Sequence, residues 1–237
     1  MKIEVLFPEI CNLYGDLGNI RYLEKTVEKA KIINTHLTDT PFFVNNKPDL
    51  IYMGTMTEKS QEIVIEKLKK YKKRIKELID EGVHFLITGN AFEIFGKKII
   101  DEKGNEIKYL GLYNTTAKRY MKQRFNCLYV GEYNKLKIVG FKSQFTHSYG
   151  DNKKYFMKTI RGSGLNPHEE KEGIKMNNFY ATYVIGPILV LNPYFTKFLL
   201  DSMGLKKYKM PFKKEMIEAY DARLKQYLEP DRGIYYI

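Results

Sequence analysis

The chain has 237 residues, of which 43% are hydrophobic, and this predicts a globular protein with one domain spanning residues 1–237. Its formal net charge of +12 is compatible with an anionic partner, but the lysines lie on solvated faces of predicted helices and no nucleic-acid-binding motif accompanies them. No apolar run approaches the ~18 residues of a membrane span, and the N-terminus lacks a signal peptide, so we expect a cytoplasmic protein.

Strands alternate with helices in the first 96 residues. Apolar stretches predict strands at 2–7, 31–37, 49–54 and 83–88, and amphipathic stretches predict helices at 19–31 and 57–82. Such alternation is typical of a parallel sheet with helices on both faces. Ligands bind such sheets outside the carboxyl ends of the strands, so we expect a site at the loops that follow Phe7, Met53 and Thr88.

The second part of the chain has a different pattern. Turn residues predict hairpins within 98–112 and 125–141, a further strand within 178–193, and helices within 193–204 and 211–229. The predicted fold is therefore a three-layer α/β fold with a mostly parallel sheet and antiparallel hairpin additions. The last residues, 230–237, end in four large side chains, "IYYI", and are compatible with either a loose tail or a docking segment.

The stretch "HFLITGNAFEIFG" predicts a strand, a sharp turn and the start of a helix. Many α/β enzymes place a nucleophile at such a turn. Here the turn contains Gly89, Asn90 and Ala91, and the quoted stretch has no Ser, Cys or Thr apart from Thr88. The turn is either an active site that has lost its nucleophile or a turn that never had one.

Several short segments, in this order, resemble class I glutamine amidotransferases of the cobyric acid synthase type, and in particular the glutaminase subunits of lipid II isoglutaminyl synthase. They include "NLYGDLGNI", "DLIYMG", "GNAFEIFGKKI", "TYVIGPIL" and "LNPYFTKFLL", and together they span nearly the whole chain. The resemblance implies a class I glutamine amidotransferase-like, flavodoxin-like fold.

The resemblance also identifies the positions of the catalytic pair. Members of the family hydrolyse glutamine with a cysteine at the strand-to-helix turn and a histidine from a later strand. Gly89 occupies the cysteine position of the Cys-Gly-Gly-Tyr/Phe-Gln pattern, and Ile185 occupies the histidine position of Thr-Tyr-Leu-His-Gly-Pro. Gly89 cannot attack an amide and Ile185 cannot carry a proton, so we expect no glutaminase activity.

Other parts of the family's site are changed or kept. The glycine run of the oxyanion loop reads Gly54-Thr55-Met56 here, and Asn90 takes the first glycine position after the cysteine. We expect the old crevice to be small and dry, with Gly89 in a tight turn and opposite Ile185. The side chains that remain as candidates for ligand binding are Asp16, Glu93, Arg124 and Lys142.

Three functions stay open from the sequence. The first is a catalytically degenerate scaffold or regulatory subunit, beside a Mur-ligase-like synthetase, in cell-wall or corrinoid amidation. The second is an enzyme with altered chemistry in the same crevice, with Glu93, Asp16, Lys142 and His147 as acid, base and charge. The third is a binder of nucleic acid or of an anionic surface. We expect no cofactor. We also expect no metal, because no histidine has metal-ligand spacing to another histidine or to a cysteine. Cys11 and Cys127 are expected to be small buried residues.

Overall fold

The computed structural model describes residues 1–230, so the question of the C-terminal tail lies outside the described residues. A six-stranded sheet forms its centre, in the order β13-β14-β4-β3-β1-β2. Its strands are β1 (Lys2–Leu6), β2 (Lys31–Thr35), β3 (Leu50–Met53), β4 (His84–Thr88), β13 (Ile174–Met176) and β14 (Phe179–Thr182). All neighbours pair in parallel except β13, which runs antiparallel to β14. The predicted parallel sheet is therefore confirmed.

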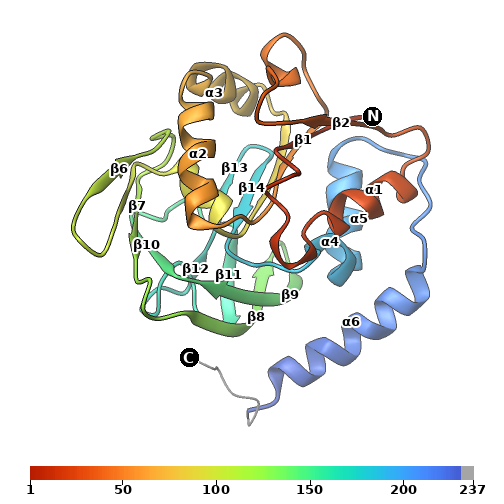
Figure 1. Cartoon of the computed structure of the whole chain (residues 1–237). Coiled ribbons are helices and arrows are strands. Elements are labelled where there is room, and N and C mark those ends of the chain that lie inside the picture. Colours follow the sequence, from red (N-terminus) through yellow and green to blue (C-terminus); the bar gives the residue numbers. More distant parts are fainter. Residues whose placement is uncertain (231–237) are drawn as a thin grey trace.

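Helices cover both faces of this sheet, as Figure 1 shows. They are α1 (Gly18–Thr26), α2 (Glu58–Lys69), α3 (Lys72–Asp80), α4 (Ile188–Leu191) and α5 (Pro193–Ser202). The side chains of β4 alternate between the two layers. Phe85 and Ile87 belong to the buried cluster that includes α2 and α3, whereas Leu86 belongs to the cluster that includes α1, α4 and α5. This alternation confirms the three-layer arrangement.

The predicted helix 57–82 is wrong in one respect, because the chain forms two helices there. Helix α2 begins after Thr57, whose side chain accepts a hydrogen bond from the Ser60 N–H as an N-cap. The break falls at residues 70–71, where no Gly or Pro marks it. Tyr71 packs edge-on against Phe43, with ring centroids 5.8 Å apart, and this tertiary contact coincides with the change of direction.

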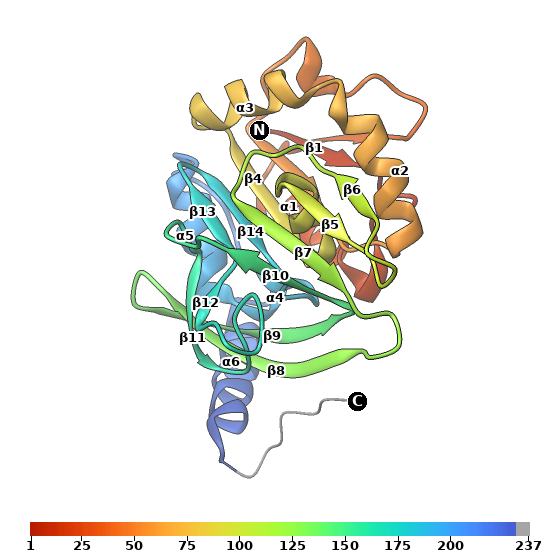
Figure 2. The same ribbon diagram turned by 90° about the vertical axis from the view of Figure 1, so that its left-hand side faces the viewer.

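Two further four-stranded sheets lie beside the central one (Figure 2). The sheet β10-β7-β5-β6 contains β5 (Lys98–Ile100), β6 (Glu106–Lys108), β7 (Thr115–Arg119) and β10 (Thr146–Gly150). The sheet β12-β11-β8-β9 contains β8 (Phe125–Tyr133), β9 (Leu136–Gln144), β11 (Met157–Arg161) and β12 (Lys171–Glu172). The antiparallel pairs β5–β6 and β8–β9 confirm both predicted hairpins.

The C-terminal helix α6 (Lys213–Leu228) packs on the β8–β9 hairpin through Tyr220, which contacts Val130 and Val139. The Tyr220 hydroxyl donates to the carbonyl of Lys137 at 2.8 Å. Within residues 1–230, no helix has the length and apolar character needed to cross a membrane.

Candidate functional site

The turn after β4 has the shape expected of a nucleophile turn. Gly89 has a φ of +62°, a left-handed conformation that glycine adopts without steric cost. The helix predicted to start after the turn is a buried 3-10 helix, η3 (Gly89–Phe95). Extended backbone resumes at Gly96 and leads into β5, so only about two turns fit between the strands.

Thr55 fills the space beside this turn. A Cβ atom at Gly89 would lie 2.1 Å from Oγ1, 2.7 Å from Cγ2 and 2.8 Å from Cβ of Thr55. These distances are shorter than van der Waals contact, so position 89 accepts a side chain only if Thr55 or the backbone moves. The loop after β3 therefore occupies the volume in which a nucleophile at position 89 would sit.

Asp16 holds Thr55 in this place. Its Oδ2 atom accepts hydrogen bonds from the Thr55 N–H at 2.8 Å, the Thr55 hydroxyl at 2.6 Å and the Thr88 hydroxyl at 2.8 Å. Asp16 has no exposed surface, and burial raises its pKa although these hydrogen bonds partly offset the effect. The carboxyl group thus joins the loop after β3 to the end of β4 from inside the protein.

Asn90 also links the loop after β3 to the turn after β4. Its Oδ1 atom accepts from the Met56 N–H at 3.1 Å, and its Nδ2 group donates to the Met56 carbonyl at 2.8 Å. The N–H groups of Thr55 and Met56 are both engaged in these internal bonds. Neither is directed at a ligand oxygen, as an oxyanion-binding amide has to be.

Ile185 lies at the same end of the sheet as Gly89. Thr88 of β4 pairs with Thr182 of β14, so Gly89 and Ile185 follow neighbouring parallel strands. Ile185 is 1% exposed, and its N–H donates to the Phe141 carbonyl at 2.8 Å. Its aliphatic side chain is therefore a buried part of this rim.

A small cavity remains at the rim, with a volume of about 110 Å³. Ligand pockets usually have volumes of about 300–1,000 Å³. Its lining residues are Leu13, Tyr14, Thr55, Met56, Thr57, Glu58, Asn90, Arg124, Ser143, Gln144, Phe145 and Thr146. Gly89 and Ile185 are not among them.

The structure does not bring the four candidate ligand-binding residues together. Arg124 lines the cavity, and its guanidinium lies 4.5 Å from the centre of the Phe145 ring. Asp16, Glu93 and Lys142 are at most 2% exposed and do not line this cavity. Each of these three takes part in an internal polar network.

Glu93 lies in η3 and connects it to two other segments. Its carboxyl oxygens accept from Gln61 Nε2 at 2.8 Å and from the Tyr183 hydroxyl at 2.9 Å. Gln61 in turn accepts from Arg119 at 2.9 Å. Burial raises the pKa of Glu93 to about 7, against the opposing effect of these hydrogen bonds. The network places a titrating carboxyl in the interior, away from the cavity.

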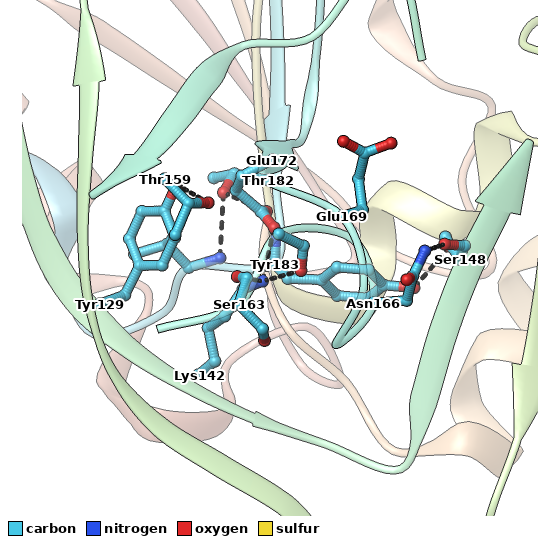
Figure 3. A network of polar contacts seen from close by, with 12 residues as sticks. Tyr129, Lys142, Ser148, Thr159, Ser163, Asn166, Glu169, Glu172, Thr182 and Tyr183 are labelled. Carbon is cyan, nitrogen blue, oxygen red and sulfur yellow. Dashed lines mark hydrogen bonds and ion pairs between the residues drawn. The ribbon is translucent and has the colours of Figure 1, made fainter. Parts of the chain in front are cut away.

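Lys142 forms the buried ion pair drawn in Figure 3. Its ammonium donates to the carbonyls of Ser163 and Gly164 at 2.8 and 2.7 Å and to the Glu172 carboxylate at 2.5 Å. The other oxygen of Glu172 accepts from the Thr182 hydroxyl at 2.9 Å and the Tyr183 N–H at 2.8 Å. This pair fixes the chain that follows β14, the segment that leads to Ile185.

The sequence alone did not identify Glu172, because the segment "KEGI" (residues 171–174) indicates only a role in maintaining the conformation of a loop. Lys142 did indicate that a buried acidic residue exists, because it occupies an inward-facing position of β9 and a buried lysine requires a partner.

His147, one of the groups considered for altered chemistry, lies in β10. It is 3% exposed, and its ring centroid is 3.9 Å from that of Phe125. Burial and the charge of Lys142 lower its pKa to about 4, so the imidazole is neutral near pH 7. Within residues 1–230, no group of three or more His, Cys, Asp and Glu side chains has the arrangement of a metal site.

Cys11 and Cys127 are buried free thiols, as predicted. The Cys11 Sγ atom lies 3.9 Å from Met56 Sδ. Burial and the carboxylates of Glu9 and Asp16 raise the pKa of Cys11, so its thiolate is disfavoured.

Comparisons with known proteins agree with this architecture. Residues 2–192 match the CobB/CobQ-like glutamine amidotransferase domain. The chain is 29% identical over 220 residues to the lipid II isoglutaminyl synthase (glutamine-hydrolyzing) subunit GatD of Staphylococcus aureus, covering 92% of this chain and 90% of that protein. It is 26% identical over 225 residues to the GatD subunit of Streptococcus pneumoniae, covering 88% and 82%.

Solved structures are similar in fold. A glutamine amidotransferase from Thermotoga maritima superposes with a TM-score of 0.54 at 12% identity, covering 96% of this chain and 93% of that one. A second glutamine amidotransferase superposes with a TM-score of 0.55 at 11% identity, covering 85% and 98%.

Proposed function

Since the chain belongs to the CobB/CobQ-like glutamine amidotransferase family, we propose that it is a non-catalytic member that scaffolds or regulates a Mur-ligase-like, ATP-using synthetase. The observation that carries this proposal is the occupied turn at Gly89, where the Thr55 side chain takes the place of a nucleophile. The protein keeps the shape of a glutaminase subunit and has replaced the reacting groups with packing and internal hydrogen bonds.

The chemistry of glutamine hydrolysis supports this proposal. The reaction needs a nucleophile and a proton carrier within hydrogen-bond reach of each other. Gly89 and Ile185 follow neighbouring strands but supply neither group. The buried Cys11 does not replace the missing thiol, because its raised pKa keeps it protonated.

The alternative of an enzyme with altered chemistry has weaker support. It requires Asp16, Glu93, Lys142 and His147 to meet a ligand, and these four side chains are buried and absent from the cavity lining. A cavity of about 110 Å³ has little room for a substrate in addition to the groups that would act on it.

A partner is proposed because the two GatD relatives are named as subunits of a synthase. The mouth of the cavity carries two exposed apolar side chains, Leu13 at 38% and Tyr14 at 45% exposure. A synthetase that covers the cavity would bury both, and buried aromatic residues contribute strongly to such interfaces.

Co-expression with a Mur-ligase-like synthetase from the same organism, followed by size-exclusion chromatography, tests this function. The two chains should elute together, and Tyr14→Glu should weaken binding about tenfold or more. The matched control is Ile63→Glu, which changes a side chain that is 48% exposed on α2 and should bind as the unchanged protein does. Separate elution of the two chains at tens of micromolar would refute the scaffold role.

A further inference from the structure

The segment that joins α5 to α6 has an unusual composition. Residues 205–214 read "LKKYKMPFKK" and contain five lysines and no acidic residue. All five lysine side chains are exposed. Phe212 is 71% exposed, more than any other large hydrophobic side chain of residues 1–230. We call residues 205–214 the basic link.

The basic link is fixed to the body of the protein. The Lys209 N–H donates to the Thr26 carbonyl at 3.1 Å, and the Tyr22 hydroxyl donates to the Pro211 carbonyl at 3.0 Å. Leu205 and Tyr208 pack against the buried cluster that includes α1 and α5. Figure 1 shows this connection running along the outer edge of the molecule, and its lysines are exposed.

Phe212 is held outward at the start of α6. Its φ is +53°, which is a true outlier for a bulky side chain. Its carbonyl accepts the Met216 N–H at 2.9 Å and so begins the helix, while its ring stays in solvent. A large apolar ring is therefore exposed among cations, and a partner that buries the ring would be favoured.

We propose that the basic link binds the surface of a bilayer that contains anionic lipids. Lysines near such a surface are attracted to its negative potential, and an aromatic ring among them inserts at the boundary between headgroups and acyl chains. The exposed lysines and the exposed Phe212 ring fit a membrane surface. Single-stranded nucleic acid is instead bound in grooves lined by successive stacking rings. The inference is independent of the function proposed above.

The nearby acidic groups leave this charge largely free. Glu218 lies 3.9 Å from Lys214 on α6, and Asp201 is engaged by Lys197 and the Tyr208 hydroxyl. None of the described ion pairs involves Lys206, Lys207 or Lys209 (residues 1–230). These three lysines are the ones to change.

Co-sedimentation with vesicles tests the inference. The full chain should bind vesicles of 70% phosphatidylcholine and 30% phosphatidylglycerol, and binding to pure phosphatidylcholine should be at least tenfold weaker. Changing Lys206, Lys207 and Lys209 together to Gln should weaken binding to the anionic vesicles on the order of 100-fold, about fivefold for each charge. Phe212→Ala should weaken it about tenfold, because the ring no longer inserts.

Two controls distinguish a specific effect of the basic link from the effects of net charge and of nonspecific hydrophobic binding. Changing Lys70, Lys72 and Lys73 together to Gln removes the same charge from exposed positions at the junction of α2 and α3, and Ile63→Ala removes an exposed apolar side chain. Both should bind as the unchanged protein does. Equal losses in the two triple variants would overturn the inference, as would no binding to anionic vesicles. If the protein binds a single-stranded oligonucleotide in a salt-sensitive way and does not bind vesicles, the partner of the basic link is nucleic acid and not a membrane.

Discussion

A side chain at Gly89 would collide with Thr55, since an added Cβ atom would lie 2.1 Å from the Thr55 hydroxyl oxygen. The two residues belong to the loops after neighbouring strands β4 and β3. Gly89 has a left-handed conformation, and the Thr55 side chain fills the space that a side chain at position 89 would need. The absence of a side chain at position 89 accommodates Thr55, so the two positions should be energetically coupled.

Gly89→Ala should lower the free energy of unfolding by about 2–4 kcal/mol, because it adds left-handed strain and a steric contact. In a Thr55→Gly background the same change should cost only about 1–2 kcal/mol, because the contact is gone and the strain remains. Chemical denaturation of the four proteins measures the difference. Gly104→Ala is the control, since Gly104 has a φ of +84° and open space around it, and its cost should be the same with and without the Thr55→Gly change. An equal cost of Gly89→Ala in both backgrounds would disprove the coupling.

Glu93 should make stability fall as the pH rises. Its pKa is about 7 in the folded protein, above its ordinary value of 4.5, so between these pH values the folded state binds more protons than the unfolded state. The contribution of Glu93 protonation to the free energy of unfolding is fully present below pH 4.5 and is lost by about pH 7.

Glu93→Gln removes this titration and places an uncharged amide of similar size at the same position. Relative to the unchanged protein, the variant should gain on the order of 3 kcal/mol in stability between pH 4.5 and pH 8. Glu4 and Asp16, whose pKa values burial also raises, titrate in both proteins and cancel in the comparison. Denaturation midpoints measured across this range should diverge, and parallel curves would contradict the assignment.

Lys142→Met should lower the free energy of unfolding by about 3–5 kcal/mol, because it leaves the buried carboxylate of Glu172 without its cation. Adding Glu172→Gln to this variant should cost less than the same change in the unchanged protein, by about 1–3 kcal/mol, since no charge is then left unpaired. Lys214→Met at the exposed pair with Glu218 is the control and should change stability little. Additive costs for Lys142 and Glu172 would show that the two groups do not stabilise each other.

Much of the architecture follows from local sequence patterns. Alternating strands and helices before Gly96 predict the parallel sheet, and the turns near Gly104 and Asn134 predict the two hairpins, because these signals lie within a few residues of the structure they specify. The left-handed turn at Gly89 is likewise a local feature.

The roles of the polar residues could not be predicted in this way. Asp16 is separated from Thr55 by 39 residues in sequence, and Lys142 from Glu172 by 30. Whether a carboxylate faces a cavity or the interior depends on such distant partners, and periodicity reports only whether a position is buried. For the same reason the sequence did not show the break of the helix at residues 70–71, which coincides with the contact between Tyr71 and Phe43.

Placing Cys at position 89 and His at position 185 should not produce glutaminase activity. In Gly89→Cys with Ile185→His, the new thiol would meet Thr55, and the Met56 N–H would still be bonded to Asn90. Ammonia release from glutamine by this double variant should stay at background. The same variant with Thr55→Gly and Met56→Gly is the matched comparison, because it reopens the loop. Hydrolysis by the double variant would show that a thiol and an imidazole at these two positions are sufficient for activity, which would contradict this prediction.

Release of ammonia from glutamine by the unchanged protein is the most direct test of the proposed non-catalytic role. It should be measured for the isolated chain and for its complex with the synthetase, against Cys11→Ser with Cys127→Ser in the same buffer. We predict that all of these samples remain at the rate of the buffer. Turnover by the unchanged protein that either cysteine change abolishes would reveal a relocated thiol, and turnover that survives both changes would reveal a different catalytic group; either result would contradict the proposal.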